Sequence, residues 1–309
     1  MAGNTGILKH ASSVPQSALY LGSLFARAGF PAGAFQTVLV EGAAVAPLIA
    51  DPRVRAVTLT GSVGAGSSVA EAAGRNVKKS VLELGGTDVF VVMPSADIPA
   101  AATAGVNARV QNSGQSCIAA KRYYIHDDVY DAFEDAFVAG MRAQVTGDPF
   151  DASTSFGPLA TEQVRRDTHE LVADAVAKGA TVLAGGELPD GPGWFYPATV
   201  LRDVTPEMRI YREECFGPVA CLYRVDSAEE AVERSNDSEF GLSSSVWTQD
   251  DGEAAYFQER IEAGGVFVNG LTASFPQLPF GGVKDSGYGR ELSALGIREF
   301  VNVKTVWRA

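Results

Sequence analysis

A single cysteine stands in the Gly- and Ser-rich segment QNSGQSCIAAKR, residues 111–122. Small residues flank Cys117 between a predicted helix and a predicted strand, so a substrate and backbone N–H donors can both reach its sulfur. A thiolate in such a loop can act as a nucleophile. The alternative is a small buried hydrophobic residue, which many free cysteines are. The segment by itself leaves both interpretations open.

A carboxylate ends the apolar run VLELGG, residues 81–86. Among apolar neighbours the pKa of Glu83 would rise, and the residue could serve as a general base near neutral pH. The alternative is a glutamate that faces solvent at the end of a strand.

Three Gly-containing segments are typical of ligand loops. TLTGSVGAG (58–66) runs from a strand into a helix whose first N–H groups favour a phosphate, although an ordinary turn with a Ser cap fits as well. REECFGPV (212–219) can place a carboxylate on a ribose, or it is only a charged loop. LPFGGVKDSGYGREL (278–292) is long enough to wrap a site.

Apolar periodicity predicts the elements that position these loops. Strands are expected at 36–40, 55–61 and 79–84, and a helix at 14–29 whose buried face holds Ala18, Leu21, Leu24 and Phe25. Strand–helix alternation is typical of a parallel, doubly wound sheet, which binds ligands at the carboxyl ends of its strands.

A second alternating region follows. Ser227 and Glu230 form a capping box that begins a helix, and the turn-rich stretch 185–197 is predicted to be an exposed excursion. The other predicted helices lie near 97–111, 128–143 and 161–178, and the other predicted strands near 121–126, 197–201, 217–223 and 242–248.

The whole chain fits a soluble enzyme. Its 309 residues are 46% hydrophobic and 20% charged, and the net charge of −12 argues against nucleic acid or an anionic membrane as a partner. Three cysteines favour a reducing compartment without a disulfide framework, and the N-terminus lacks a signal peptide, so a cytoplasmic location is expected. The three histidines show no metal-ligand spacing, and no metal is expected.

Taken together, GNTGILK, TGSVGAG, ELGG, GQSC, EECFGP and PFGGVKDSG resemble the aldehyde dehydrogenase superfamily from residue 3 to the C-terminus. GNTGILKHASSVPQ and NSGQSCIAAKR are similar to the bacterial succinate-semialdehyde dehydrogenase branch. The resemblance implies an α/β fold with four parts. They are the remainder of a Rossmann-type dinucleotide-binding domain (1–85), an α/β catalytic domain (86–275), a return segment that closes the active site (276–299) and an oligomerisation tail strand (300–309).

The resemblance also implies roles for single residues. Cys117 matches the nucleophile, Glu83 the general base, and Glu291 an acid that relays a proton. The cofactor, NADP or NAD, would be held by residues that match the family's adenine-ribose, phosphate and nicotinamide contacts: Lys9, Gly61, Ser62, Gly85, Glu214 and Phe216. Ser12 stands where many NAD-preferring relatives carry Glu, which predicts that NADP is accepted.

The implied substrate is a small aldehyde, most readily succinate semialdehyde, whose distal carboxylate needs a basic or hydroxyl partner. Arg109 and Ser274 are the candidates, and the alternative for Arg109 is a surface helix residue. The resemblance further implies a homo-oligomer, a dimer or a tetramer.

Family members begin well before residue 1 of this chain, and the segment they carry there supplies one donor of the oxyanion hole. Loss of such a donor costs on the order of a hundredfold in rate. An inactive remnant that serves as a binding or assembly module is therefore an alternative function. A thiol esterase that uses Cys117 and Glu83 without nucleotide is another.

Overall fold

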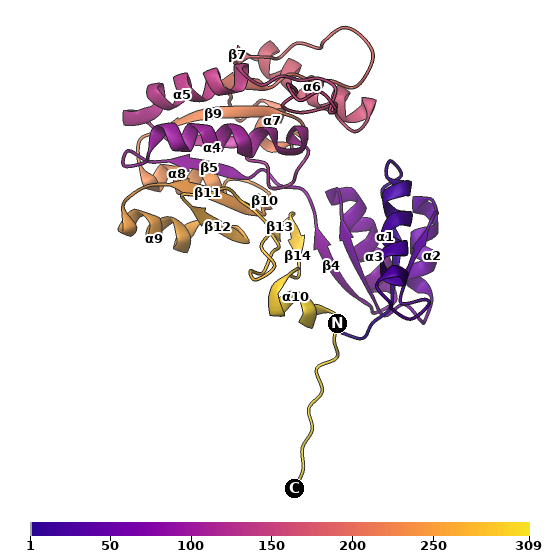
Figure 1. The fold of residues 1–309 in the computed structure, drawn as a ribbon. Helices are drawn as coiled ribbons and strands as arrows, with labels where there is room; N and C mark the ends of the chain where they lie inside the picture. The colour runs from indigo at the N-terminus through magenta and orange to yellow at the C-terminus, as the bar shows by residue number, and fades with distance from the viewer. Residues whose placement is uncertain (1) are drawn as a thin grey trace. The chain divides into compact units, whose positions relative to one another are not determined.

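The computed structural model describes residues 2–309, which divide into two compact units (Figure 1). Of the described residues, unit 1 comprises 2–83, Phe275–Phe280 and Gly289–Ala309, and unit 2 comprises Leu84–Ser274 and Gly281–Tyr288. The segment predicted to return over the active site, 276–299, is thus shared between the two units. No helix in the described part of the chain combines the length and the apolar character that crossing a membrane requires.

Unit 1 contains parallel strand pairs with helices between the strands. The strands are β1 (Gly6–Lys9), β2 (Phe35–Val38), β3 (Ala56–Thr60) and β4 (Lys79–Glu83). The helices are α1 (Pro15–Arg27), the short 3-10 turn Gly42–Ala44, α2 (Val45–Ala50), α3 (Val63–Arg75) and α10 (Ser293–Glu299). β1 pairs with β2 and β3 pairs with β4, both in parallel.

Two expectations for unit 1 are corrected. Among residues 2–309 no ladder joins the β1–β2 pair to the β3–β4 pair, so the continuous parallel sheet predicted from the alternation is not formed. Alternation reveals strands and their order, but not which strands become neighbours. On α1 only Ala18 is fully buried, and Leu21 is 45% exposed, because β1 and β2 give this helix a narrow surface to cover.

Unit 2 is built on a seven-stranded sheet. In spatial order its strands are β12 (Gly265–Val268), β11 (Ser243–Trp247), β5 (Val89–Val92), β6 (Arg122–His126), β9 (Val219–Val225), β8 (Thr199–Arg202) and β7 (Thr181–Ala184). All neighbours are parallel except β7, which runs antiparallel to β8 at the edge. The short strands β10 (Phe240–Gly241) and β13 (Val283–Lys284) form an antiparallel pair, and β14 (Gly287–Tyr288) follows them.

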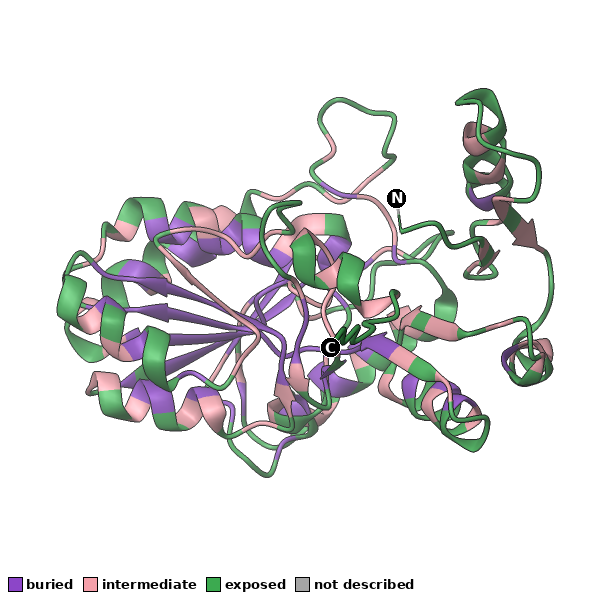
Figure 2. Ribbon diagram, turned by 90° about the horizontal axis from the view of Figure 1, so that it is seen from below, coloured by how far each residue is buried: buried purple, intermediate pink, exposed green. Residues whose placement is uncertain are grey.

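Helices cover both faces of this sheet. They are α4 (Ile98–Val110), α5 (Asp127–Arg142), α6 (Glu162–Ala177), α7 (Arg209–Arg212), α8 (Ala228–Asn236) and α9 (Asp251–Arg260). Alternate residues of β5 enter different cores: Phe90 and Val92 pack with α4 and α5, whereas Val89 and Val91 pack with α6, α8 and α9. The inner strands β5, β6, β9 and β11 are therefore buried on both sides, as parallel strands between helices are, and Figure 2 shows the inner strands in purple.

Several local predictions agree with the structure. Ser227 caps α8 by accepting a hydrogen bond from the Glu230 N–H (3.2 Å). Of the excursion predicted at 185–197, residues 187–194 are exposed, whereas Tyr196 is 1% exposed and belongs to the core. The predicted tail strand is not formed in the described chain, where Val303 and Trp307 are each 86% exposed. Its pairing with another copy stays a prediction, because a strand needs a partner.

Candidate active site

Cys117 lies on the connection between α4 and β6, within unit 2. The chain leaves α4 through three successive residues in the left-handed region, Asn112 (φ 50°), Ser113 (φ 58°) and Gly114 (φ 76°), and then turns at residues 116–119. Cys117 is half-buried, whereas Cys215 and Cys221 lie in the core, where burial raises their thiol pKa values to about 11 and about 12. Of the three thiols, Cys117 is therefore the one that a reactant can approach.

Hydrogen bonds fix the first part of this connection. The Asn112 side-chain amide donates to the Gln115 carbonyl oxygen (2.9 Å), and the Ser113 hydroxyl donates to the Gly157 carbonyl oxygen (3.0 Å). The Gln115 side-chain oxygen accepts from the Ala160 N–H (2.7 Å). These bonds tie the loop to a neighbouring segment of unit 2 and hold backbone conformations that non-glycine residues adopt only at a cost.

Arg109 lies beneath the loop instead of on a surface. Its side chain is fully buried, and Nη2 donates to the Gly114 carbonyl oxygen (2.7 Å). Burial lowers the pKa of its guanidinium. Both expectations for Arg109 are wrong: it is not a surface helix residue, and a side chain without exposed surface offers no contact to a substrate carboxylate. Its position makes it a support for the turn at Gly114.

A second buried cation holds the other half of the loop. The Lys121 ammonium donates to three backbone carbonyl oxygens, those of Ser116 (3.2 Å), Cys117 (3.1 Å) and Ala119 (3.0 Å). It also lies 3.5 Å from a carboxylate oxygen of Glu214. The side chain of Lys121 is 5% exposed, and this burial lowers its pKa.

Glu214 joins Lys121 to the glycine pair that follows β4. Its Oε1 accepts a hydrogen bond from the Gly86 N–H (3.0 Å). A Cβ on Gly85 would lie 2.4 Å from Glu214 Oε2, and a Cβ on Gly86 would lie 2.7 Å from the Cys117 carbonyl oxygen. Gly86 therefore needs glycine, because a side chain there would meet the backbone of the cysteine loop, whereas a side chain at Gly85 would displace the Glu214 carboxylate.

Two other predicted site residues of unit 2 are exposed. Phe216, two residues after Glu214, is 38% exposed, and Ser274 is exposed at the end of the segment Leu84–Ser274.

Unit 1 carries the other predicted residues. Glu83, the last residue of β4, is 2% exposed, so the interpretation as a solvent-facing glutamate is wrong. Its backbone carbonyl accepts from the Gly61 N–H (3.0 Å). Glu291 is half-buried, and its backbone pairs with that of Phe280.

The carboxyl ends of two strands of unit 1 present exposed polar residues. Lys9 ends β1 and Ser12 lies in the turn that follows. Ser62 follows β3 and caps the 13-residue helix α3, with its hydroxyl accepting from the Ala65 N–H (3.3 Å). Gly61 and Ser62 are both exposed, so the first N–H groups of α3 are open to an anionic group.

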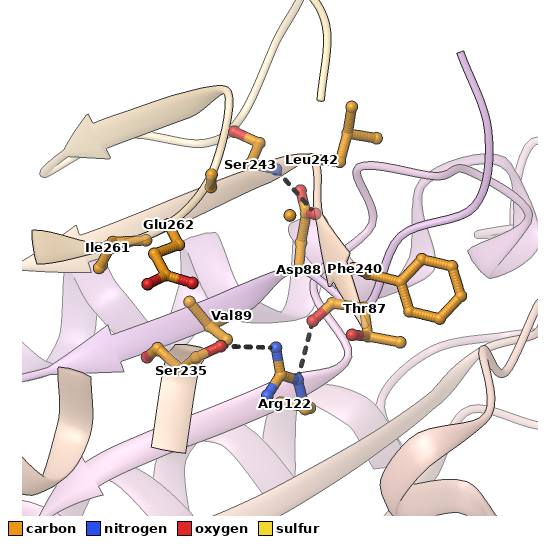
Figure 3. Close-up of a pocket in the computed structure, with 12 residues that line it drawn as sticks. Thr87, Asp88, Val89, Arg122, Ser235, Phe240, Leu242, Ser243, Ile261 and Glu262 are labelled. Atoms are coloured by element: carbon orange, nitrogen blue, oxygen red, sulfur yellow. Dashed lines mark hydrogen bonds between the residues drawn. The ribbon is translucent and has the colours of Figure 1, made fainter. Parts of the chain in front are cut away.

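A separate polar pocket lies within unit 2 (Figure 3). Thr87, Asp88, Arg122, Ser243 and Glu262 contribute to its lining, and Cys117 is not one of the lining residues described. Asp88 Oδ1 accepts from the Ser243 N–H (3.0 Å), and burial raises the pKa of Asp88 to about 7. The pocket borders the nucleophile loop, because the backbone N–H of Lys121 donates to the Asp88 carbonyl oxygen (2.9 Å).

Lys121, Asp88 and Arg122 are buried charged residues that the sequence-based interpretation missed. The sequence does mark these residues, because each one interrupts or borders an apolar run. Lys121 and Arg122 lie in IAAKRYYIH, and Asp88 lies in GGTDVFVV. A charge in such a place must be paired, and a paired buried charge points to an organised site. Within residues 2–309, His, Cys, Asp and Glu side chains form no group of three or more that could hold a metal.

Comparison with known proteins identifies what the chain is similar to. The model of the aldehyde dehydrogenase family matches residues 1–306. A protein named aldehyde dehydrogenase from Paenarthrobacter nicotinovorans is 73% identical over 307 residues, which are 99% of this chain and 67% of that protein. Succinate-semialdehyde dehydrogenase [NADP(+)] 1 of Mycobacterium ulcerans is 58% identical, with the same coverage of both proteins.

A solved structure shares the fold. The crystal structure of succinic semialdehyde dehydrogenase from Streptococcus pyogenes, in complex with NADP+, superposes with a TM-score of 0.96 at 40% identity and covers 99% of this chain and 67% of that one. The predicted α/β fold class is thereby confirmed. The chain spans about two thirds of the length of these relatives.

Proposed function

Because the chain belongs to the aldehyde dehydrogenase family, we propose that it oxidises an aldehyde with NADP or NAD, and that succinate semialdehyde is its substrate. The observation that carries the proposal is the half-buried Cys117 on a loop that two buried cations hold. The substrate is supported by the 58% identity to a succinate-semialdehyde dehydrogenase.

The proposed chemistry proceeds on Cys117. Its thiolate attacks the aldehyde carbon, forms a C–S bond and gives a thiohemiacetal. A nicotinamide held by Glu214 and Phe216 would supply the acceptor for the hydride that leaves this carbon, so that a thioester would remain on the sulfur. Water, deprotonated by Glu83, adds to the thioester, and the C–S bond breaks to release the carboxylic acid and the thiolate. Glu291 is proposed to pass the proton from Glu83 onward.

The residues that would hold the cofactor fit such a group. The exposed N-terminus of α3, with Gly61 and Ser62, offers N–H donors to the phosphates. We assign Lys9 to the adenine ribose, and Glu214 and Phe216 to the nicotinamide ribose and ring. Ser274 is the remaining candidate for the substrate carboxylate. We also propose that the chain forms a homodimer or homotetramer and that it acts in the cytoplasm.

The proposal is tested by following reduced nicotinamide when the full chain meets succinate semialdehyde and NADP. We expect turnover that Cys117→Ala abolishes. Cys221→Ala, which removes a thiol from the core, is the matched control and should retain turnover. A folded chain without turnover would refute the proposal in favour of a binding or assembly module. Ester hydrolysis without nucleotide would favour a thiol esterase.

Cofactor choice is tested at Ser12. A hydroxyl there can donate a hydrogen bond to the 2′-phosphate of NADP, whereas a carboxylate would repel it. Ser12→Glu should therefore raise the KM for NADP and leave the KM for NAD unchanged or lower. Comparison of both KM values with those of Ser13→Glu, the neighbouring exposed serine, separates the specific effect from added negative charge. A wild-type chain with a strong preference for NAD would contradict the assignment.

A further inference from the structure

The loop that carries Cys117 is built around an ammonium group. Lys121 donates to the carbonyl oxygens of Ser116, Cys117 and Ala119 at 3.0–3.2 Å, which uses all three donors of a protonated amine. A neutral amine has only two N–H donors, so this set of partners selects the charged form. The backbone of the nucleophile thus wraps a buried positive charge.

The other charged groups around Lys121 define its balance. Glu214 lies 3.5 Å away, and Asp88 is the second acid that acts on it. The positive charge of Arg109 repels that of Lys121 and lowers the Lys121 pKa. The positive charge of Arg122 attracts the Asp88 carboxylate and lowers the Asp88 pKa. Lys121 also interacts electrostatically with the ionised form of Cys117. The Glu214 carboxylate therefore partly neutralises the Lys121 charge that stabilises a thiolate in this loop.

We propose that Lys121 is the positioning residue of this site: its charge orders the loop and favours the thiolate of Cys117, and Glu214 moderates that effect. The proposal rests on the proposed function only in treating Cys117 as the nucleophile. A thiolate, not a thiol, reacts with an alkylating agent. The rate at which Cys117 is alkylated at each pH therefore reports its ionisation without any turnover.

The experiment measures alkylation of Cys117 by iodoacetamide across a pH series, with mass spectrometry to assign the modified residue. In Lys121→Met we expect the midpoint of the profile to rise by about one pH unit or more, so that alkylation at neutral pH is about tenfold slower, while the limiting rate at high pH stays close to that of the wild type. Lys121→Arg retains the positive charge, so its midpoint should lie close to that of the wild type.

Two further variants keep the test decisive. Glu214→Gln removes the competing charge and leaves Lys121 in place, so its midpoint should move in the opposite direction, to lower pH. Lys178→Met removes an exposed lysine that donates to the Glu207 carbonyl oxygen (2.7 Å) and should leave the profile unchanged. If Lys121→Met does not fold, the direction of the Glu214→Gln shift decides.

Identical profiles for Lys121→Met and the wild type would overturn the proposal, as would a rise of the midpoint in Glu214→Gln. The outcome is distinguishable from failure of the proposed function. A wild-type chain without turnover whose Cys117 alkylation still depends on Lys121 would refute the dehydrogenase activity and support the role of Lys121.

Discussion

Asp88 is a carboxyl group whose folded surroundings favour its neutral form. Burial raises its pKa to about 7, against the lowering effect of Lys121, and one of its oxygens accepts the Ser243 N–H. In an unfolded chain the pKa would be about 3.9. Between these values the folded state binds the proton more tightly, so the contribution of Asp88 to stability falls as the pH rises from about 4 to about 7.

Asp88→Asn should remove this pH dependence. The quantity to compare is the unfolding temperature of the variant minus that of the wild type. We expect this difference to be larger at pH 8 than at pH 5, because only the wild type must bury a charge at the higher pH. Thermal unfolding at several pH values measures it. Asp190→Asn, at an exposed carboxyl, should show no such trend. A difference for Asp88→Asn that is the same at both pH values would contradict the prediction.

At the scale of the element, the connection from α4 to β6 depends on Gly114. Its φ of +76° disfavours any side chain, and a Cβ there would lie 2.4 Å from the Gly217 carbonyl carbon. Gly114→Ala should therefore lower the free energy of unfolding by more than about 1 kcal/mol, as measured by urea denaturation. Gly191→Ala has a positive φ (+105°) in open space and reports the backbone strain alone. Equal losses in the two variants would show that the close approach to Gly217 costs nothing.

Much of each element could be predicted from the sequence, and pairings across long distances could not. Apolar runs correctly placed β3 and β4, and small flanking residues singled out Cys117. Asp88, by contrast, binds a backbone group 155 residues away, and a one-dimensional pattern holds no information on that distance. Arg109 was misplaced for a related reason, since a helix with apolar residues on every side has no face that marks burial. The buried strand β5 was missed because VFVV is too short to show a period.

At the scale of the whole molecule, the first strand pair of unit 1 is less deeply buried than the central strands of unit 2. Every residue of β5 is buried, whereas β1 alternates between half-buried and exposed positions. Local opening needs less free energy where few apolar contacts must break. Backbone amides of β1 and β2 should therefore exchange with deuterium faster than those of β5 and β6 in the native protein. Hydrogen exchange followed by mass spectrometry measures this, and equal protection of both strand sets would contradict it.

The exposed connection between β7 and β8 should tolerate inserted residues at its tip. Residues 189–193 are all exposed, and a Cβ on Gly191 would meet nothing within 4 Å. The tip of the connection is therefore a natural insertion site, since added residues there need not displace packed side chains. An affinity tag or a fluorescent peptide placed after Asp190 would give the protein a handle that leaves both termini free.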